Sequence, residues 1–192
     1  EEAIWLEQHG CDAIIAMGYE AGGHRGMFLS DDLSTQVGTF ALVPQVVDAV
    51  KVPVIAAGAI SDARGVAAAL MLGASAVQVG TAFLFTPEAK VSASHHKALR
   101  TAKESQTAIT NIFTGRPARG IVNRAMRELG PMSAQAPAFP LAGGALMPLR
   151  AKDDADFANL WAGQALTLGK DIGSAELTRQ LAEGALAKLN RH

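Results

Sequence analysis

Three short apolar runs, each followed closely by glycine, constrain the fold of this chain more than any other feature. They occupy residues 12–16, 52–57 and 76–79, and segments with apolar residues at helical spacing separate them. The run at 52–57 is apolar on both faces, as a parallel strand covered by helices should be. Alternation of strands and helices indicates a parallel sheet joined by right-handed crossovers. We therefore predict an α/β fold with ligands bound at the carboxyl ends of the strands.

The same patterns predict the helices and divide the chain into two parts. Helices are expected at 2–9, 40–50, 62–72 and 174–190, and near Pro87. Ser61 or Asp62 is the expected cap of the third helix. Residues 114–119 are typical of a turn between two short strands. We predict βα units with ligand-binding loops over residues 1–91, and a helical cap with a C-terminal helix over 92–192.

Glycines follow all three predicted strands and mark candidate ligand positions. A single glycine there is usually only a tight turn, but three successive loops with glycine at the same end favour a binding site. In an eight-stranded α/β barrel, backbone N–H groups of the last two such loops bind phosphate. The pairs Gly58-Ala59 and Gly80-Thr81 suit this position, and neither loop contains lysine or arginine. Gln78, at the end of its strand, can hydrogen-bond a ring carbonyl or a hydroxyl group.

The loop at 17–26 is the densest cluster of reactive groups in the sequence. A lone histidine is more often structural than catalytic, but His24 lies on a loop at the ligand end of the predicted sheet, and imidazole exchanges protons near neutral pH. Glu20 is expected either to orient His24 or to pair with Arg25. Trp161 is expected to pack rather than to line a pocket. The other histidines considered are expected on solvated helix surfaces, namely His9, His95 and His96.

Composition argues against several functional classes. The formal net charge is −1, with charges spread along the chain, so neither nucleic acid nor a membrane surface is an expected partner. No apolar run approaches the roughly 18 residues of a membrane-spanning helix. The single cysteine, Cys11, excludes an internal disulfide and suits a reducing compartment, which indicates the cytoplasm. The chain opens at Glu1 within a helical pattern, so we expect a part of a longer protein, a removed initiator methionine being the alternative.

Six motifs in order along the chain together carry a family resemblance. They lie at 20–26 (Glu-Ala-Gly-Gly-His-Arg-Gly), 53–60 (Pro-Val-Ile-Ala-Ala-Gly-Ala-Ile), 72–74 (Leu-Gly-Ala), 77–83 (Val-Gln-Val-Gly-Thr-Ala-Phe), 115–119 (Gly-Arg-Pro-Ala-Arg) and 161–164 (Trp-Ala-Gly-Gln). Their set and order resemble the nitronate monooxygenase family, formerly called 2-nitropropane dioxygenase. The resemblance implies the C-terminal portion of an FMN-binding TIM (β/α)8 barrel, about strands 6–8, with a helical cap and tail.

The resemblance also implies a reaction and a set of site residues. The family oxidises alkyl nitronates with FMN and O₂, which gives a carbonyl compound and nitrite. His24 matches the active-site histidine, which holds the anionic nitronate or removes the α-proton of a neutral nitroalkane. The implied partners are a small nitronate and O₂, with FMN as cofactor and no metal. The implied flavin contacts are Gly22, Ala59, Gln78, Gly80 and Thr81, with Gly23 and Gly58 adjacent.

Two residues depart from the family pattern. Met17 stands where the family often has glutamine, and a thioether cannot donate the hydrogen bond that glutamine gives to the flavin. Ala59 replaces the second glycine of the usual Gly-Gly-Ile. Its backbone N–H remains a donor, but its methyl group lies near the implied phosphate. We therefore expect a negative φ at Ala59.

Two alternatives remain open beside the nitronate enzyme. An FMN-dependent enoyl reductase of fatty-acid synthesis shares the fold, the cofactor and the Gly-Gly-His loop, but would take hydride from NAD(P)H and reduce an enoyl thioester. The motifs at 115–119 and 161–164 favour the nitronate enzyme over this alternative. The other alternative is a truncated, non-catalytic fragment, because three or four strands cannot close a barrel of eight.

Overall fold

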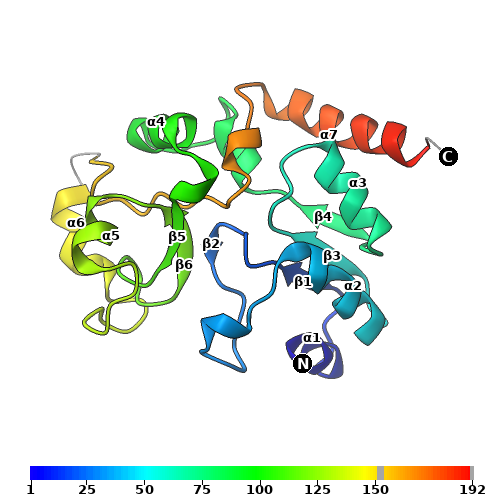
Figure 1. The fold of residues 1–192 in the computed structure, drawn as a ribbon, viewed down its shortest axis with the longest axis horizontal. Helices are drawn as coiled ribbons and strands as arrows, with labels where there is room; N and C mark the ends of the chain where they lie inside the picture. Colours follow the sequence, from blue (N-terminus) through cyan, green and yellow to red (C-terminus); the bar gives the residue numbers. More distant parts are fainter. Residues whose placement is uncertain (151–153, 191–192) are drawn as a thin grey trace.

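The computed structural model describes residues 1–150 and 154–190, and this part of the chain forms two three-stranded sheets (Figure 1). The first sheet is parallel with the order β1-β3-β4, and its strands are β1 (Ile14–Met17), β3 (Val54–Ala57) and β4 (Ala76–Gln78). In its ladders Ile14 lies opposite Val54, and Ile55 lies opposite Ala76. The three predicted strands are therefore confirmed, with ends shifted by one or two residues.

Helices alternate with these parallel strands. They are α1 (Glu2–Gln8), α2 (Thr39–Ala49) and α3 (Ala63–Met71). The α1 helix ends just before Gly10, whose φ of +85° turns the chain toward β1 as glycine readily permits. The order β1-α2-β3-α3-β4 is that of successive βα units in a TIM barrel, so the α/β prediction is confirmed.

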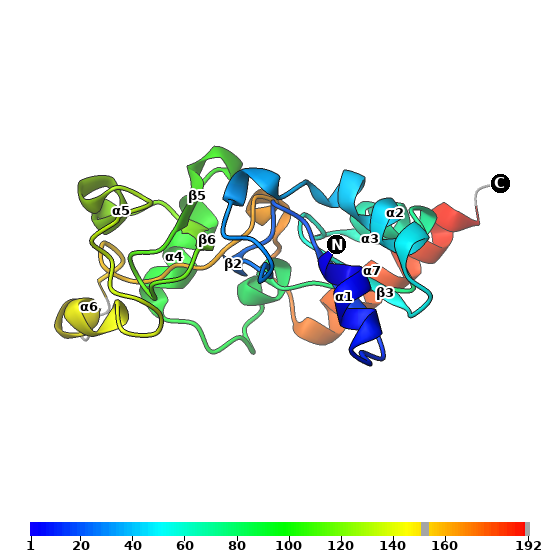
Figure 2. The same cartoon turned by 90° about the horizontal axis from the view of Figure 1, so that it is seen from below.

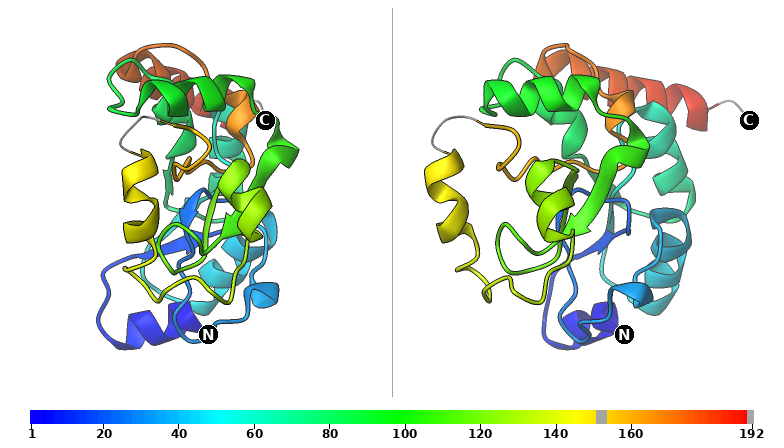
Figure 3. Two further views of the ribbon diagram at one scale, coloured as in Figure 1. Left: turned by 90° about the vertical axis from the view of Figure 1, so that its left-hand side faces the viewer. Right: turned by 60° about the vertical axis from the view of Figure 1, so that its left-hand side comes forward.

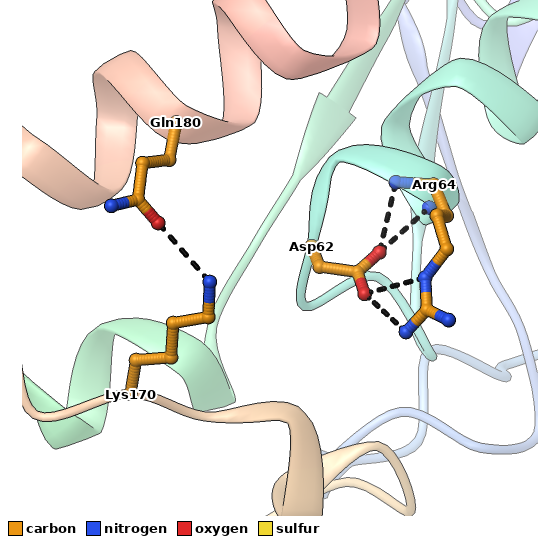
Figure 4. Close-up of polar contacts among 5 residues, drawn as sticks. Asp62, Arg64, Lys170 and Gln180 are labelled. Carbon is orange, nitrogen blue, oxygen red and sulfur yellow. Dashed lines mark hydrogen bonds and ion pairs between the residues drawn. The ribbon is translucent and has the colours of Figure 1, made fainter. Parts of the chain in front are cut away.

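Asp62, one of the two expected caps, begins α3. Its carboxylate accepts hydrogen bonds from the backbone amides of Arg64 and Gly65, which have no partner within the first turn of the helix. Figure 4 shows that the guanidinium group of Arg64 folds back onto the same carboxylate, and that Lys170 donates to Gln180 nearby. These contacts fix the point at which the loop after β3 turns into α3.

The C-terminal helix α7 (Ser174–Leu189) completes the core of the α/β part. Leu177, Leu181 and Ala185 on α7 are buried in the same apolar cluster as Val43 and Ala56. Figure 1 shows α7 beside α3, and the two helices contact each other, with Gly184 of α7 close to Ala63 at the start of α3. The predicted helix is confirmed, and it packs against the α/β units.

The second sheet is antiparallel and includes the loop after β1. Its order is β2-β6-β5, and its strands are β2 (Gly23–His24), β5 (Thr107–Thr110) and β6 (Ala118–Ile121). Gly23 pairs with Arg119, and His24 pairs with Ala118. The two strands expected around the turn at 114–119 are present. Residues 92–192 thus contain part of a sheet in addition to the helices that the sequence predicted.

The remaining helices surround this antiparallel sheet. They are α4 (Ala93–Thr101), α5 (Arg124–Leu129) and α6 (Gly143–Arg150). Figure 2 shows the antiparallel sheet with α5 and α6 on one side of the molecule and the α/β units on the other, and Figure 3 shows α4 and α7 along the same face. A five-residue 3₁₀ segment at Thr81–Phe85 precedes Pro87, so the helix expected there begins later, at Ala93. No helix among the described residues is long and apolar enough to cross a membrane.

Candidate functional site

A cavity of about 200 Å³ opens at the carboxyl ends of all three parallel strands. The last residue of each strand lines it, namely Met17 of β1, Ala57 of β3 and Gln78 of β4. The loops that follow the strands supply most of the remaining wall. All seven residues expected to contact a cofactor line this one cavity: Gly22, Gly23, Gly58, Ala59, Gln78, Gly80 and Thr81.

Two of these glycines differ in their surroundings: Gly22 is packed against protein backbone, and Gly80 faces open space. A Cβ atom on Gly22 would lie 2.5 Å from the backbone nitrogen of Gly163 and 2.6 Å from the carbonyl carbon of Ala162. Glycine at position 22 therefore permits a close approach between two chain segments. A Cβ atom on Gly80 would meet no protein atom within 4 Å. Gly80 consequently leaves open space beside the cavity that it lines, as a backbone that receives a ligand should.

Ala59 has a positive φ of 57°, so the expectation of a negative φ is wrong. The reason lies in the tight exit from β3. Gly58 has φ +103°, and its carbonyl oxygen accepts a hydrogen bond of 3.1 Å from Thr39 Oγ1. The chain must then turn within one residue for Ile60 to enter the core, where 7% of its surface stays exposed. A left-handed conformation costs a non-glycine residue roughly 1–2 kcal/mol, and such strain concentrates at binding sites.

Backbone and hydroxyl groups give the cavity its hydrogen-bond donors. Within the described residues, the amides of Ala59 and Gly80 donate to no backbone carbonyl. Thr81 begins a 3₁₀ turn, and the first N–H groups of such a turn have no partner inside it. Thr81 Oγ1 accepts a 3.0 Å hydrogen bond from the amide of Gly163, which leaves its own hydrogen as a donor. No lysine or arginine of the described part of the chain lines the cavity, so an anionic group there would be held by dipoles.

His24 stands beside this cavity, next to Gly23, which lines it. Its Nε2 atom is 2.9 Å from Thr114 Oγ1. The indole ring of Trp161 lies 5.7 Å from the imidazole, and the ring of Phe139 lies 5.9 Å away, edge-on. Partial burial lowers the pKa of His24 below 6.5, and the positive charge of Arg116 lowers it further. The imidazole is therefore neutral at pH 7 and able to accept a proton.

Trp161 lines the cavity, so the expectation that it only packs is wrong. Residues Ala162 to Gln164 bring the chain back to the loop after β1, where the Gln164 amide donates to the carbonyl oxygen of Glu20 at 3.0 Å. The motif at 161–164 was the available signal for this contact, because a Trp-Ala-Gly segment lets a backbone approach closely.

His95 is half-buried, and its Nε2 atom lies 3.2 Å from the Trp161 carbonyl oxygen. Burial lowers the pKa of His95, so it is not a solvated surface histidine.

Glu20 takes neither of the two contacts expected from the sequence. Its carboxylate accepts hydrogen bonds of 2.9 Å from both the backbone amide and the hydroxyl of Thr39, the first residue of α2. It therefore serves the N-terminus of α2, where a negative charge and an acceptor are favourable. Among the described residues it forms no ion pair with Arg25, although its charge still raises the pKa of that group slightly against the larger effect of burial.

Two buried arginines hold the carbonyl groups of the loop after β1. Arg25 is 3% exposed and donates to the carbonyl oxygens of Gly18 and Ala21, both at 2.7 Å. Arg119, 2% exposed, donates to the carbonyl oxygen of Tyr19 at 3.0 Å. Both guanidinium groups lie over the ring of Tyr19, at 6.0 and 4.8 Å from its centre. Burial lowers the pKa of Arg25 to about 10, so both groups stay charged at pH 7.

Comparison with known proteins agrees with this geometry. A family model described as "Nitronate monooxygenase" matches residues 1–184. The nitronate monooxygenase of Pseudomonas aeruginosa is 43% identical over 95% of this chain and 54% of its own length. A probable nitronate monooxygenase of Staphylococcus saprophyticus is 40% identical over 100% of this chain and 56% of its own length. This chain thus spans about half the length of the curated relatives it matches.

Solved structures resemble the whole described fold. A nitroalkane oxidase from Streptomyces ansochromogenes superposes with a TM-score of 0.88 and 40% sequence identity, covering 98% of this chain and 55% of the other. FabK from Thermotoga maritima superposes with a TM-score of 0.80 and 31% identity, covering 98% of this chain and 59% of the other. Both neighbours extend well beyond the region that this chain covers.

Proposed function

The chain belongs to the nitronate monooxygenase family, and from this premise we propose that it supplies the cofactor loops and the active-site histidine of an enzyme that oxidises alkyl nitronates or nitroalkanes. The products are a carbonyl compound and nitrite, and the oxidant is O₂. One observation carries the proposal. All seven residues expected at the cofactor line a single cavity, and His24 stands at its edge.

The cavity suits FMN by the chemistry of its donors. The amides of Ala59, Gly80 and Thr81 would hold the phosphate, and the Gln78 amide group would hydrogen-bond the polar edge of the ring or a ribityl hydroxyl. Open space at Gly80 leaves room for the group. When bound, FMN supplies the two-electron chemistry and the reactivity toward O₂ that side chains lack.

The single cysteine, Cys11, fits a reducing compartment, so we assign this reaction to the cytoplasm.

His24 has the protonation state that a general base needs. Its neutral imidazole accepts the α-proton of a nitroalkane, and the rings of Trp161 and Phe139 beside it offer an apolar surface to the alkyl chain. We expect His24→Ala to keep the flavin bound and to lower nitroalkane turnover by about 10²–10⁴-fold, the usual contribution of a positioned base. Flavin absorbance and nitrite release measure the two effects separately. Loss of flavin from the variant would make His24 structural.

Anaerobic mixing tests the reaction class. The flavin should be bleached rapidly by ethyl nitronate and slowly by NADPH. The opposite result would favour the enoyl reductase, which has less support because the family model and the curated relatives are nitronate monooxygenases. A purified protein without a flavin spectrum would favour the non-catalytic alternative.

A further inference from the structure

Thr114 lies in the turn between β5 and β6 and makes three contacts through one hydroxyl oxygen. Its Oγ1 atom is 2.9 Å from His24 Nε2 and 3.2 Å from the carbonyl oxygen of Arg116. The backbone amide of Arg116 also donates to it, at 3.4 Å. A hydroxyl group carries one hydrogen and two lone pairs, so three contacts use its full capacity.

The acceptor that this single hydroxyl hydrogen takes determines which ring nitrogen of His24 carries a hydrogen. A carbonyl oxygen can only accept, so the Arg116 carbonyl takes the hydroxyl hydrogen. The two lone pairs of Thr114 Oγ1 then accept from the Arg116 amide and from His24 Nε2. His24 Nε2 must consequently carry a hydrogen. The reverse assignment, with Thr114 donating to His24, leaves the Arg116 carbonyl without this donor.

Two hydrogen bonds to backbone carbonyl groups fix the distance between the turn and His24. The amide of Arg25, the next residue after His24, donates to the carbonyl oxygen of Pro117 at 2.9 Å. The guanidinium group of Arg116 donates to the carbonyl oxygen of Met27, also at 2.9 Å. The hydroxyl of Thr114 is therefore presented to His24 by a rigid turn and not by a free side chain.

We infer that Thr114 is a positioning residue that holds His24 as the Nε2–H tautomer and leaves the Nδ1 lone pair available as the base. Among the described residues no group donates to Nδ1. This inference rests on the proposed function, because only a substrate with an α-proton needs a base. A neutral nitroalkane must lose that proton, whereas a pre-formed nitronate has already lost it.

Two substrates and two variants of the flavin-loaded protein test the inference. Thr114→Val removes the acceptor at nearly constant shape, and Thr114→Ser keeps it. We expect Thr114→Val to lower kcat for nitroethane at least about tenfold more than kcat for ethyl nitronate, within the range that a positioned base contributes. Thr114→Ser should restore most of the nitroethane rate. Equal losses on both substrates, or no loss on nitroethane, would overturn the inference.

Ring-nitrogen NMR on ¹⁵N-histidine-labelled protein at pH 8 gives a readout that does not depend on turnover. In the wild type, the His24 Nε2 signal should be that of a protonated nitrogen and the Nδ1 signal that of an unprotonated one. In Thr114→Val both signals should shift toward a mixture of tautomers. An Nδ1–H tautomer in the wild type would refute the inference. If the wild type oxidises neither substrate, the proposed function fails, while these spectra still decide the role of Thr114.

Discussion

The loop after β1 and the loops after β3 and β4 face the same cavity but hold their shapes by different means. The latter two rely on backbone conformation, with Gly58 and Ala59 both at positive φ and Gly80 beside open space. The loop after β1 relies on side chains, because Arg25 and Arg119 bind its carbonyl groups. Backbone N–H groups are enough to bind a phosphate, whereas a general base must be held in one orientation. The way each loop is held in shape therefore matches the role proposed for it.

The largest effect on folding should come from the side chains of the loop after β1. Arg119→Met should cost roughly 3 kcal/mol, because it removes a buried guanidinium group, leaves the part-buried Tyr19 carbonyl without the donors it had, and removes the cation from the Tyr19 ring. Urea unfolding would measure the loss. Arg124→Met is the matched control, since Arg124 is exposed, its ion pair with Glu128 lies along its own helix, and its only ring contact among the described residues is with Phe157 at 5.7 Å, so it should change little. Similar losses in both variants would contradict the role given to Arg119.

Glycine substitutions should separate packing from ligand space. Gly22→Ala should cost about 2 kcal/mol, because the new methyl group would meet the backbone of Ala162 and Gly163. Gly80→Ala should leave stability nearly unchanged, because its methyl group meets no protein atom, and should weaken FMN binding instead. Thermal unfolding and flavin titration measure the two properties. If Gly80→Ala destabilised the apoprotein as much as Gly22→Ala, the open space at Gly80 would not be reserved for a ligand.

Ala59→Gly should stabilise the protein by up to about 1 kcal/mol, since glycine adopts a positive φ without the strain that alanine bears. The matched control is Ala68→Gly on the exposed face of α3, which should lose about 1 kcal/mol of helix stability. Opposite signs in urea unfolding would confirm that backbone strain is stored in the loop after β3. A loss of stability in both variants would contradict it.

The smallest expected effect concerns the pKa of His24. Burial is the larger cause that lowers this pKa, and the positive charge of Arg116 is the smaller one. Arg116→Gln should raise this pKa part of the way toward 6.5, and Arg116→Lys should not, because it keeps the charge. The native state prefers neutral His24, so its contribution to stability is present above pH 6.5 and declines as pH falls from 6.5 through the lower native pKa. That decline should be smaller in Arg116→Gln. An NMR titration of the His24 ring would detect the change, and equal shifts in both variants would assign it to geometry.

The parallel sheet and its ligand loops were predictable because their signals are local. Apolar runs define β1, β3 and β4, and a glycine follows each run at the ligand end. The conformation of Ala59 was not predictable from residue type, because Thr39 and Ile60 impose it through tertiary contacts. The partners of Glu20 were missed for a similar reason. Its acceptors serve a helix that begins 19 residues later, which no local pattern encodes.

The cavity position of Trp161 and the contact between Thr114 and His24 depend on pairing between distant segments. Single-sequence periodicity indicates that 114–119 forms a turn, but not which strand the hairpin joins. β2 contains only two residues, too few for any alternation to show. The resemblance to the family implied that His24 is the active-site histidine, and this stays a prediction. The structure places His24 next to Gly23 beside the cavity, and the groups that surround its ring became visible only in three dimensions.

The pairing of β2 with β6 also has a consequence for the order in which the site assembles. The strands of the sheet β1-β3-β4 are joined by short crossovers, so the loops after β3 and β4 are made early on the growing chain. The partner of His24 lies 90 residues further along the sequence, and at a translation rate of roughly 5–20 residues per second it emerges several seconds later. The loops after β1, β3 and β4 therefore leave the ribosome before Thr114, whereas Trp161 and Gly163, which line the same cavity, and α7, which completes the core, leave it after Thr114. The cavity wall and the surroundings of His24 are thus both completed by segments that are made late.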